Sequence, residues 1–524
     1  MPSTPFDRPT SPLRAYHPFL FALFPLGSLY TANVAEVPPV SLLRPALVLL
    51  FVAAFLWLSW RALSKNALKA ALITSATLVL FFSYDHVVQV LRKWPGLGWQ
   101  LGRNRILMPF WVLLLLVVIG ATLRSRRDLR GVTSLLNAFA GACLSVAVAQ
   151  SALGWLQFQR TPSEPLPPIP IAQGVAAPDA PDIFYIILDA YGRSDTLRAY
   201  YGYDNTPFVR ALEKRGFFVA PRSQSNYSQT ALSLSSSLNL SYHSDLARRM
   251  GSSNDRRPLF KEIQNSKVAS FLRARGYDVV CITSGADWVQ TAGARVVDAG
   301  RPVTSIEELL FDSTMLHEVP QAAAFRYNQR RRLLSYALEQ LPKAANHIEN
   351  NSPPRFVFAH ILAPHPPFVW NEKGEPVNPP HPYYEFDGPI DFSPASLDEY
   401  RRGYCAQIQA LNTQILQAVD GIRANSRRPP IIIIQGDHGP SVGRTGDQDN
   451  RTIRMAMLNA FCLPPTASPL SVDARPYSTI SPVNNFRIVF NRTFKTHFPL
   501  LPDHSYYSSW EHPYEFSDAT GRKP

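Results

Sequence analysis

The sequence is poor in cysteine and in charged residues for its length. Only four of its 524 residues are Cys, and no two of them form a C-x-x-C pair. This argues against a disulfide framework and against a zinc site built from cysteines. Charged residues make up only 17% of the chain, whereas hydrophobic residues make up 46%. The chain is therefore neither disordered nor fibrous, and it is long enough to bury a large core.

The basic residues are unevenly distributed along the chain. The formal net charge is +13, and residues 1–160 contain 15 of the 52 basic and 4 of the 39 acidic residues. This hydrophobic first third therefore carries +11, and the remainder carries only +2. A basic total alone would fit a nucleic-acid partner or a membrane surface. Its location favours membrane topology and predicts no nucleic-acid partner.

Residues 1–160 contain long apolar runs separated by short basic or Pro/Gly-bearing loops. Crossing the hydrocarbon core of a bilayer takes about 20 helical residues, and each run is close to that length. We therefore predict a membrane region at 1–160 with about five transmembrane helices; the alternative is four, with the first run, which contains Pro25, lying at the interface. The runs begin near Pro18, Leu43, Ala70, Ile106 and Thr133.

Loop charges predict the orientation of these spans, because Lys and Arg near span ends tend to stay cytoplasmic. With five spans and a cytoplasmic N-terminus, nine basic residues lie inside, and five lie outside before the last span. No small-residue cleavage site follows the first run, so a signal peptide is a poor interpretation. We expect a multi-pass protein of the cell (cytoplasmic or inner) membrane whose C-terminal domain is extracytoplasmic.

The remainder divides into a linker and a soluble domain. Residues 161–181 contain seven prolines and predict a semi-rigid spacer. Residues 182–524 alternate almost wholly apolar strands, such as those at 183–188 and 431–434, with amphipathic helices. This pattern predicts an α/β domain with a largely parallel central sheet that is buried on both faces.

Sites in such sheets form at the carboxyl ends of strands. The first apolar strand ends at Asp189, the last ends at Asp437 and His438, and a third strand-like segment leads to His365. Carboxylate and imidazole together suit Zn²⁺ or Mn²⁺. Each residue alone would also fit a turn or a helix cap.

Thr230 begins a Ser-rich segment where a loop turns into a predicted helix. Its hydroxyl would lie at a helix N-terminus, which stabilises an oxyanion. Alone, Thr230 would fit an ordinary N-cap.

Taken in order behind a membrane region, these pieces resemble the sulfatase-like membrane branch of the alkaline phosphatase superfamily. Lipoteichoic acid synthases, phosphoglycerol transferases and phosphoethanolamine transferases belong to that branch. The resemblance implies that Thr230 is both nucleophile and metal ligand, and that Asp189, Asp437 and His438 bind the same metal. It also implies that His365, and less securely His360, contacts the phosphoryl group or the leaving oxygen. Trp288 would either line the substrate pocket or pack as a loop residue.

Two departures from the family narrow the chemistry. Thr230 is followed by ALSL rather than the C-x-P-x-R or S-x-P-x-R of formylglycine sulfatases, which argues against sulfate-ester hydrolysis by that cofactor. Phosphoethanolamine transferases usually carry another His shortly after the Asp-His-Gly turn, and residues 440–461 contain none. A single divalent metal is therefore expected, Mn or Zn ahead of Mg or Ca, and ethanolamine phosphate is in doubt as the transferred group.

The predicted activity is transfer of a phospholipid-derived head group to an envelope glycan, lipid or polymer through a phospho-threonine. Two other classes stay open. A sulfatase-like hydrolase would use the same residues with water as acceptor. A non-catalytic envelope-binding protein would be expected to have lost site residues.

Overall fold

The computed structural model divides into two compact units. One contains Met1–Arg160 and Pro302–Ala323, and the other contains Thr161–Arg301 and Ala324–Pro524. The residues that the structure describes are 14–34, 36–94, 104–160, 180–285, 287–300, 303–318, 320–347, 352–379, 383, 387–388, 394–441, 448–465 and 471–521. Most of the predicted linker at 161–181 lies outside these residues.

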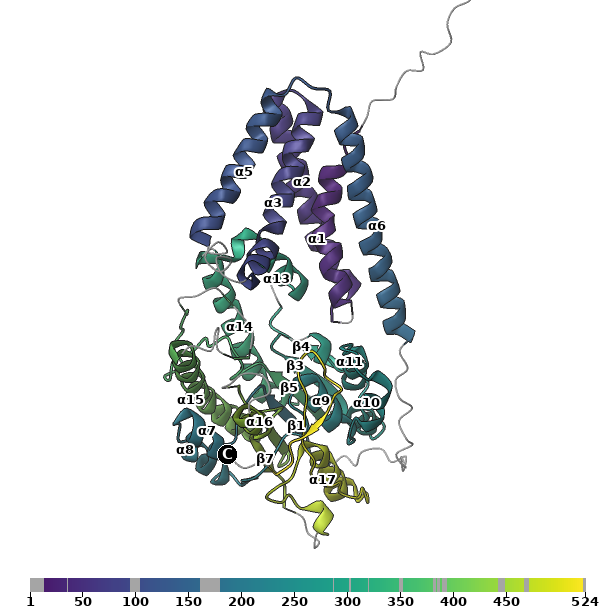
Figure 1. The fold of residues 1–524 in the computed structure, drawn as a ribbon. Coiled ribbons are helices and arrows are strands. Elements are labelled where there is room, and N and C mark those ends of the chain that lie inside the picture. Colours follow the sequence, from purple (N-terminus) through teal and green to yellow (C-terminus); the bar gives the residue numbers. More distant parts are fainter. Residues whose placement is uncertain are drawn as a thin grey trace, which may run out of the picture. The chain divides into compact units, whose positions relative to one another are not determined.

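The first unit is a bundle of helices (Figure 1). Its elements are α1 (His17–Asn33), η1 (Pro39–Leu42), α2 (Leu43–Ser64), α3 (Ala67–Lys93), α5 (Asn104–Arg124), α6 (Arg130–Arg160), α13 (Ser305–Asp312) and η3 (Met315–Glu318).

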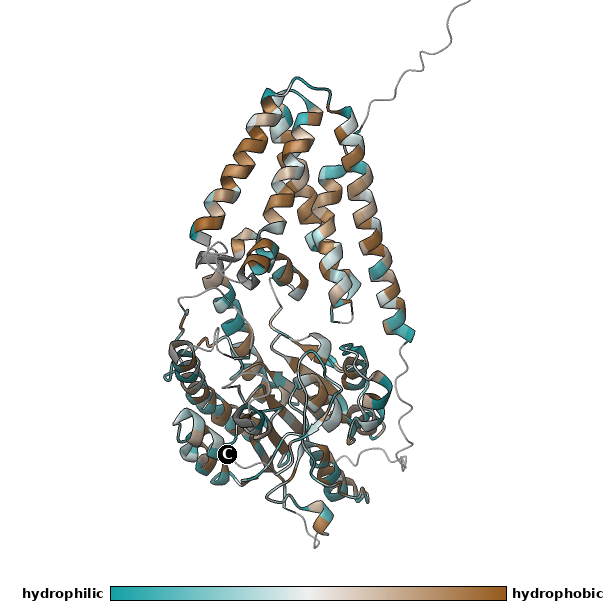
Figure 2. Cartoon of the chain, viewed as in Figure 1, coloured by the Kyte–Doolittle hydropathy of each residue, from teal (hydrophilic) through white to brown (hydrophobic). Residues whose placement is uncertain are grey.

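Among the described residues, four helical stretches are long and apolar enough to cross a membrane, namely Pro39–Ser64, Ala67–Leu91, Arg105–Arg124 and Arg130–Arg160. They mark the chain as a membrane protein. Figure 2 shows hydrophobic residues along most of α2 and α5, and only 6% of the most apolar window of α5 is buried within the protein. Helices that expose this much apolar surface require lipid around them.

The fifth predicted span corresponds to α1, which at 17 residues is shorter than the other four. Length therefore supports four spans rather than the five predicted. The contacts of α1 nevertheless run parallel to α6. Near its start, the backbone N–H of His17 donates to Asn137 Oδ1 (2.9 Å), and near its end Thr31 Oγ1 lies 2.9 Å from Ser151 Oγ.

Residues 302–323 return to the helical unit from the predicted soluble half of the sequence. Ile306 and Leu310 of α13 are buried in one cluster with Leu26 and Tyr30 of α1. Glu307 receives two hydrogen bonds from Arg44 at the start of α2, one of them from Nε at 2.7 Å. The same carboxylate completes a capping box with Thr304. The sequence-based division had placed this segment within 182–524.

The second unit is an α/β domain. Its strands are β1 (Ile183–Leu188), β2 (Phe217–Val219), β3 (Asp278–Thr283), β4 (Arg295–Val297), β5 (Arg355–Ile361), β6 (Ile431–Gly436), β7 (Asn459–Cys462), β8 (Tyr506–Tyr507) and β9 (Ser517–Asp518). Its helices are α7 (Ser194–Tyr201), α8 (Thr206–Glu213), α9 (Thr230–Asn239), α10 (Ser244–Met250), α11 (Arg257–Gln264), α12 (Lys267–Arg273), η2 (Asp287–Val289), α14 (Pro320–Ala344), whose first turn counts with the helical unit, α15 (Pro394–Asn425), α16 (Gln448–Met455), η4 (Val472–Ala474) and α17 (Pro482–Phe494).

Seven strands form the central sheet in the order β2-β7-β6-β1-β5-β3-β4. β6, β1, β5, β3 and β4 are parallel, and β7 runs antiparallel to both β6 and β2. β1 is buried at every position, since its odd-numbered residues pack against α9, α12 and α17, while α14 and α15 lie on the other face (Figure 1). The predicted fold class, membrane helices followed by a largely parallel α/β domain, is confirmed.

Candidate metal centre and nucleophile

Three neighbouring strands of the sheet end at one group of ligand-type side chains. Ile187 of β1 lies opposite His360 of β5, and Leu188 lies opposite Gly436 of β6. Asp189, His360 and Asp437 therefore leave the sheet at nearly the same level. One ligand atom from each lies within 4.8 Å of the others, and all three residues are buried.

Four buried atoms of this group have no hydrogen-bond partner within the described protein: Asp189 Oδ1, Asp437 Oδ2, and both ring nitrogens of His360. His360 Nε2 lies 3.2 Å from Asp189 Oδ2. Burying polar atoms without partners costs about 1–3 kcal/mol each, so convergent unpartnered ligand atoms are expected where an ion completes them. Two carboxylates and an imidazole fit a divalent cation of the Zn²⁺ or Mn²⁺ kind.

Two backbone N–H groups hold one oxygen of the Asp437 carboxylate. Its Oδ1 accepts from the N–H groups of Ala190 and His438, each at 2.9 Å, which leaves Oδ2 to face the group. The hydroxyls of Ser225 (2.5 Å) and Ser233 (2.7 Å) donate to its carbonyl oxygen. The Ser-rich helix α9 thus packs closely behind the ligand that it helps to fix.

Ala190 takes a left-handed conformation, with φ of 63°, which is strained for a residue with a Cβ. Two hydrogen bonds stabilise this turn: its N–H donates to Asp437, and its carbonyl accepts from Tyr404 of α15 at 2.7 Å. The strain lies directly beside Asp189, at the end of β1.

Thr230 is the first residue of α9, and its Oγ1 lies 3.2 Å from His438 Nε2. His438 Nδ1 lies 2.9 Å from the carbonyl of Gly439, which can only accept, so Nδ1 carries the proton and Nε2 carries the lone pair. Thr230 is half-buried, whereas Asp437 and His438 are fully buried. Solvent therefore reaches the site from the side of the hydroxyl.

His365 lies beside Asp189. Its backbone N–H donates to the Asp189 carbonyl (3.1 Å), and its Nδ1 donates to the carbonyl of Pro366 (2.7 Å). Burial raises the pKa of Asp189, but the neighbouring imidazoles of His365, His360 and His438 outweigh burial and hold this pKa below its ordinary value. Asp189 is therefore ionised, as a metal ligand must be.

The structure shows the surroundings of His360 and Trp288, which were both considered as substrate contacts. His360 was expected to touch the substrate, but it lies with Asp189 and Asp437 in the group that could hold a metal ion. Its position near the end of β5 is the sequence signal that could have indicated a ligand role. Trp288 lies in η2 and contacts Phe260 with its ring tilted by 38°, at 4.8 Å between ring centroids. It packs against the core, which fits the alternative of a packed loop residue.

Sequence reasoning missed a charged pair at the edge of the site. Arg454, in the last turn of α16, forms an ion pair with Asp387, and its Nη2 lies 3.3 Å from His438 Nε2. The Tyr400 hydroxyl donates to Asp387 Oδ1 at 2.9 Å. Burial raises the pKa of Asp387, but Arg454, His365 and His438 lower it by more, so the pKa lies below its ordinary value and Asp387 is ionised. Only the fold brings these residues together, since they are far apart in sequence.

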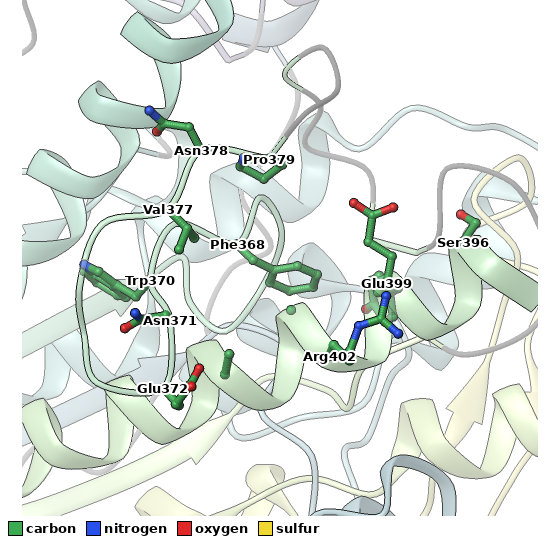
Figure 3. Close-up of a pocket in the computed structure, with 13 residues that line it drawn as sticks. Phe368, Trp370, Asn371, Glu372, Val377, Asn378, Pro379, Ser396, Glu399 and Arg402 are labelled. Carbon is green, nitrogen blue, oxygen red and sulfur yellow. The ribbon is translucent and has the colours of Figure 1, made fainter.

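A pocket of about 400 Å³ adjoins this pair between residues 368–379 and α15. Figure 3 shows Phe368 between Trp370 and Val377 on one side and Glu399 and Arg402 on the other. Tyr400 connects the pocket to the site, because it lines the pocket while its hydroxyl reaches Asp387.

Comparison with known families agrees with this geometry. The sulfatase family model matches residues 181–461, which is more than half of the chain. The chain belongs to the sulfatase family. The sulfatase-family domain carries all the site residues described above, and it makes the protein an enzyme that acts on phosphate or sulfate esters. No curated protein matches the sequence.

Several solved structures are remotely similar. The C-terminal periplasmic domain of EptC from Escherichia coli, in complex with Zn, is 13% identical (TM-score 0.37; 60% of this chain and 82% of that one). The lipooligosaccharide phosphoethanolamine transferase EptA from Neisseria meningitidis is 13% identical (TM-score 0.38; 86% and 88%). The phosphonate monoester hydrolase of Agrobacterium radiobacter is 13% identical (TM-score 0.39; 62% and 80%). No function is transferred from similarities this remote.

Proposed function

We propose that this sulfatase-family enzyme is a membrane-bound, metal-dependent transferase. It moves a phospholipid-derived head group, phosphoglycerol or a similar group, to a hydroxyl of an envelope glycan, lipid or polymer. The main support is one juxtaposition: the Thr230 hydroxyl, 3.2 Å from His438 Nε2, lies at the end of the sheet that gathers the unpartnered atoms of Asp189, His360 and Asp437.

One divalent ion, Mn or Zn ahead of Mg or Ca, would be held by Asp189, Asp437, His438 and Thr230, with His360 as a further ligand. When bound, such an ion lowers the pKa of a coordinated hydroxyl and neutralises charge on phosphoryl oxygens. The mixed carboxylate and imidazole donors support this choice of metals.

The protein's residues then divide the chemistry. Thr230 loses its hydroxyl proton to water, and its Oγ1 forms a bond to phosphorus while the bond from phosphorus to the diacylglycerol oxygen breaks. His365, half-buried beside Asp189, donates a proton to that leaving oxygen. In the second step His365 takes the proton of an acceptor hydroxyl as that oxygen attacks phosphorus, the bond from phosphorus to Thr230 Oγ1 breaks, and Oγ1 takes a proton from water.

A phospholipid donor is favoured because ATP is not available outside the cytoplasm and the apolar helices hold the enzyme at a bilayer. A hydrolase would use the same residues with water in the second step. A purely binding protein is disfavoured, because Asp189, Thr230, Asp437 and His438 are all present and lie together.

The proposed orientation has the N-terminus in the cytoplasm and the sulfatase-family domain outside. The parallel contacts of α1 and α6 support α1 as a fifth span, because α1 lies beside residues 137–151 of the long helix α6. Five spans place residues 14 and 160 on opposite sides of the membrane. A single cysteine introduced near the N-terminus of a cysteine-free variant should resist an impermeant thiol reagent in intact cells; labelling would contradict this topology.

The function is tested with the full-length protein in liposomes of phosphatidylglycerol and phosphatidylethanolamine, with Mn²⁺ or Zn²⁺ added. Wild-type protein should release diacylglycerol and yield a phosphorylated peptide containing Thr230, both measured by mass spectrometry. Thr230→Ala should lower release by at least about 10³-fold, because it removes the proposed nucleophile.

Thr206→Ala is the matched control, since Thr206 also begins a helix, α8, but its hydroxyl contacts Asp204 and Arg198 instead. It should leave diacylglycerol release unchanged. Retained activity in Thr230→Ala would overturn the assignment of the nucleophile. Release of the free head group with no labelled acceptor, when envelope lipids or glycans are supplied, would favour the hydrolase.

A further inference from the structure

Arg454 reaches the candidate metal site from α16, which contributes none of the candidate ligands. Its Nη1 pairs with Asp387, and its Nη2 donates to the carbonyl of Ser228 at 2.9 Å. The same Nη2 lies 3.3 Å from His438 Nε2, the atom that Thr230 Oγ1 approaches to 3.2 Å. Only 15% of the Arg454 side chain is exposed.

Both ends of this arrangement are fixed by the fold. The Gly439 N–H donates to the Arg454 carbonyl at 2.8 Å. A Cβ at Gly439 would lie 2.0 Å from the carbonyl oxygen of Ile453, so only glycine lets the turn after β6 approach α16 this closely. On the other side, Tyr400 holds Asp387 by a 2.9 Å hydrogen bond. The guanidinium is thus oriented before any substrate arrives.

The contact between Arg454 and His438 cannot persist in a metal-loaded site. His438 Nε2 has one lone pair, and a ligand to an ion gives up that lone pair. The Nη2–H group would then be left without this acceptor, directed at the space beside Thr230 Oγ1. Arginine N–H groups match the oxygens of tetrahedral oxyanions in geometry and charge.

The formal charge of the site also favours binding of an anion by Arg454. The carboxylates of Asp189, Asp437 and Asp387 carry a formal charge of −3, and one divalent ion would leave −1. Arg454 brings this set to neutrality before an anionic ester enters. Without Arg454 the same ester would meet a net negative site, which repels anions.

We propose that Arg454 binds a non-bridging oxygen of the phosphoryl or sulfuryl group that reacts at Thr230, and that Asp387 is a positioning residue that orients the guanidinium. This inference rests on the proposed function and deepens it by naming the side chain that recognises the anionic group. The ligand class is a tetrahedral oxyanion, either as part of an ester or free.

The test measures binding of orthovanadate to the full-length, metal-loaded protein in nanodiscs by calorimetry, with metal content by elemental analysis and thermal stability alongside. Arg454→Gln should weaken orthovanadate binding about 10- to 100-fold, the range for a lost charge-assisted hydrogen bond, with metal content unchanged. Arg454→Lys should restore part of the affinity. Asp387→Asn should give a smaller loss than Arg454→Gln.

The control is Arg487→Gln in α17, because Arg487 also binds backbone carbonyls from a largely buried position but lies on Leu240 and Pro499. It should bind orthovanadate like the wild type. If Arg454→Gln does not fold, Arg454→Lys decides the matter, with a loss of about tenfold expected because the planar fork is gone.

Two results would overturn the inference. One is orthovanadate binding within twofold of wild type in Arg454→Gln, or in Arg454→Lys where that variant decides. The other is a loss of metal in parallel with the loss of binding, which would mean that Arg454 only supports His438. Failure of the wild-type protein itself to bind orthovanadate with metal present would instead overturn the proposed function.

Discussion

The two units differ in where they place their large apolar side chains. In the helical unit the buried positions include many small residues, such as Ala53 and Ala140 at 0% exposure, while Phe51 (72%) and Leu135 (69%) point outward. In the sulfatase-family unit the largest aromatic residues, such as Tyr185 and Phe358, are fully buried. The first unit is built for a solvent of lipid tails, where close packing of small residues joins helices, and the second for water.

The difference extends to polar groups. The sulfatase-family unit gathers buried carboxylates and imidazoles at one edge of its sheet and leaves four of their atoms unpartnered. A water-soluble fold can hold such a costly group only if something else compensates. The helical unit therefore exposes apolar side chains, whereas the sulfatase-family unit buries polar atoms without partners. Substitutions can test each of these features.

Substituting the buried candidate metal ligands should have the largest effect on metal content and activity. Asp437→Asn removes a ligand charge while keeping the hydrogen bonds to Ala190 and His438 possible, so bound metal should be lost and turnover should fall by at least about 10³-fold. His360→Gln should weaken metal affinity about 10- to 100-fold if His360 is a ligand. Elemental analysis after dialysis against a weak chelator measures both.

His243→Gln serves as the control for His360, because His243 is equally buried but contacts Ser235 and Glu262. It should keep its metal even if its stability falls. Full metal occupancy in His360→Gln would show that His360 is not a ligand and that its unpartnered nitrogens need another explanation.

Placing a charge on the exposed apolar surface of the helical unit should have an intermediate effect. Phe51→Lys places a charge on an outward face of α2 and should disfavour membrane insertion by about 2.5–3.5 kcal/mol if that position lies near the bilayer centre. Val472→Lys changes an 83% exposed residue of the other unit and should be neutral within about 0.5 kcal/mol. The yield of membrane-integrated, folded protein distinguishes them. Equal yields would contradict the contrast between the two solvents.

The smallest effect is expected where α13 docks on the helices. Burial raises the pKa of Glu307, but its hydrogen bonds with Arg44 and Thr304 lower it below the ordinary value. Its stabilising contribution is therefore present above the ordinary carboxyl pKa of about 4.3 and is lost as pH falls through the lower folded value. Glu307→Gln should cost no more than about 1 kcal/mol, because Arg44 is half exposed.

Hydrogen exchange of residues 303–318 at neutral and acid pH measures this. The gap between wild type and Glu307→Gln should close as pH falls below about 4. A gap that persists in acid would mean that Glu307 acts through something other than its charge.

The sequence predicted those parts of the site that carry a local signature. Apolar strands followed by Asp189 and by Asp437–His438 are contiguous patterns, as is Thr230 at the start of a Ser-rich helix, so the sheet and its candidate ligands could be predicted. Arg454 and Asp387 could not, because neither lies in such a pattern and their ion pair forms only in the folded protein. The docking of residues 302–323 was missed for a similar reason: amphipathic helix α13 gives no sign of which surface buries Ile306.

The path of residues 302–323 means that more than one stretch of chain joins the two units. Chain connections between the two units occur three times, after Arg160, Arg301 and Ala323. With α13 packed on α1 and α2, the chain joins the two units at Arg301 and at Ala323 as well as after Arg160. A protease that cuts the spacer would therefore leave the catalytic half attached, and a domain expressed from Pro181 onward would carry Ile306 and Leu310 uncovered.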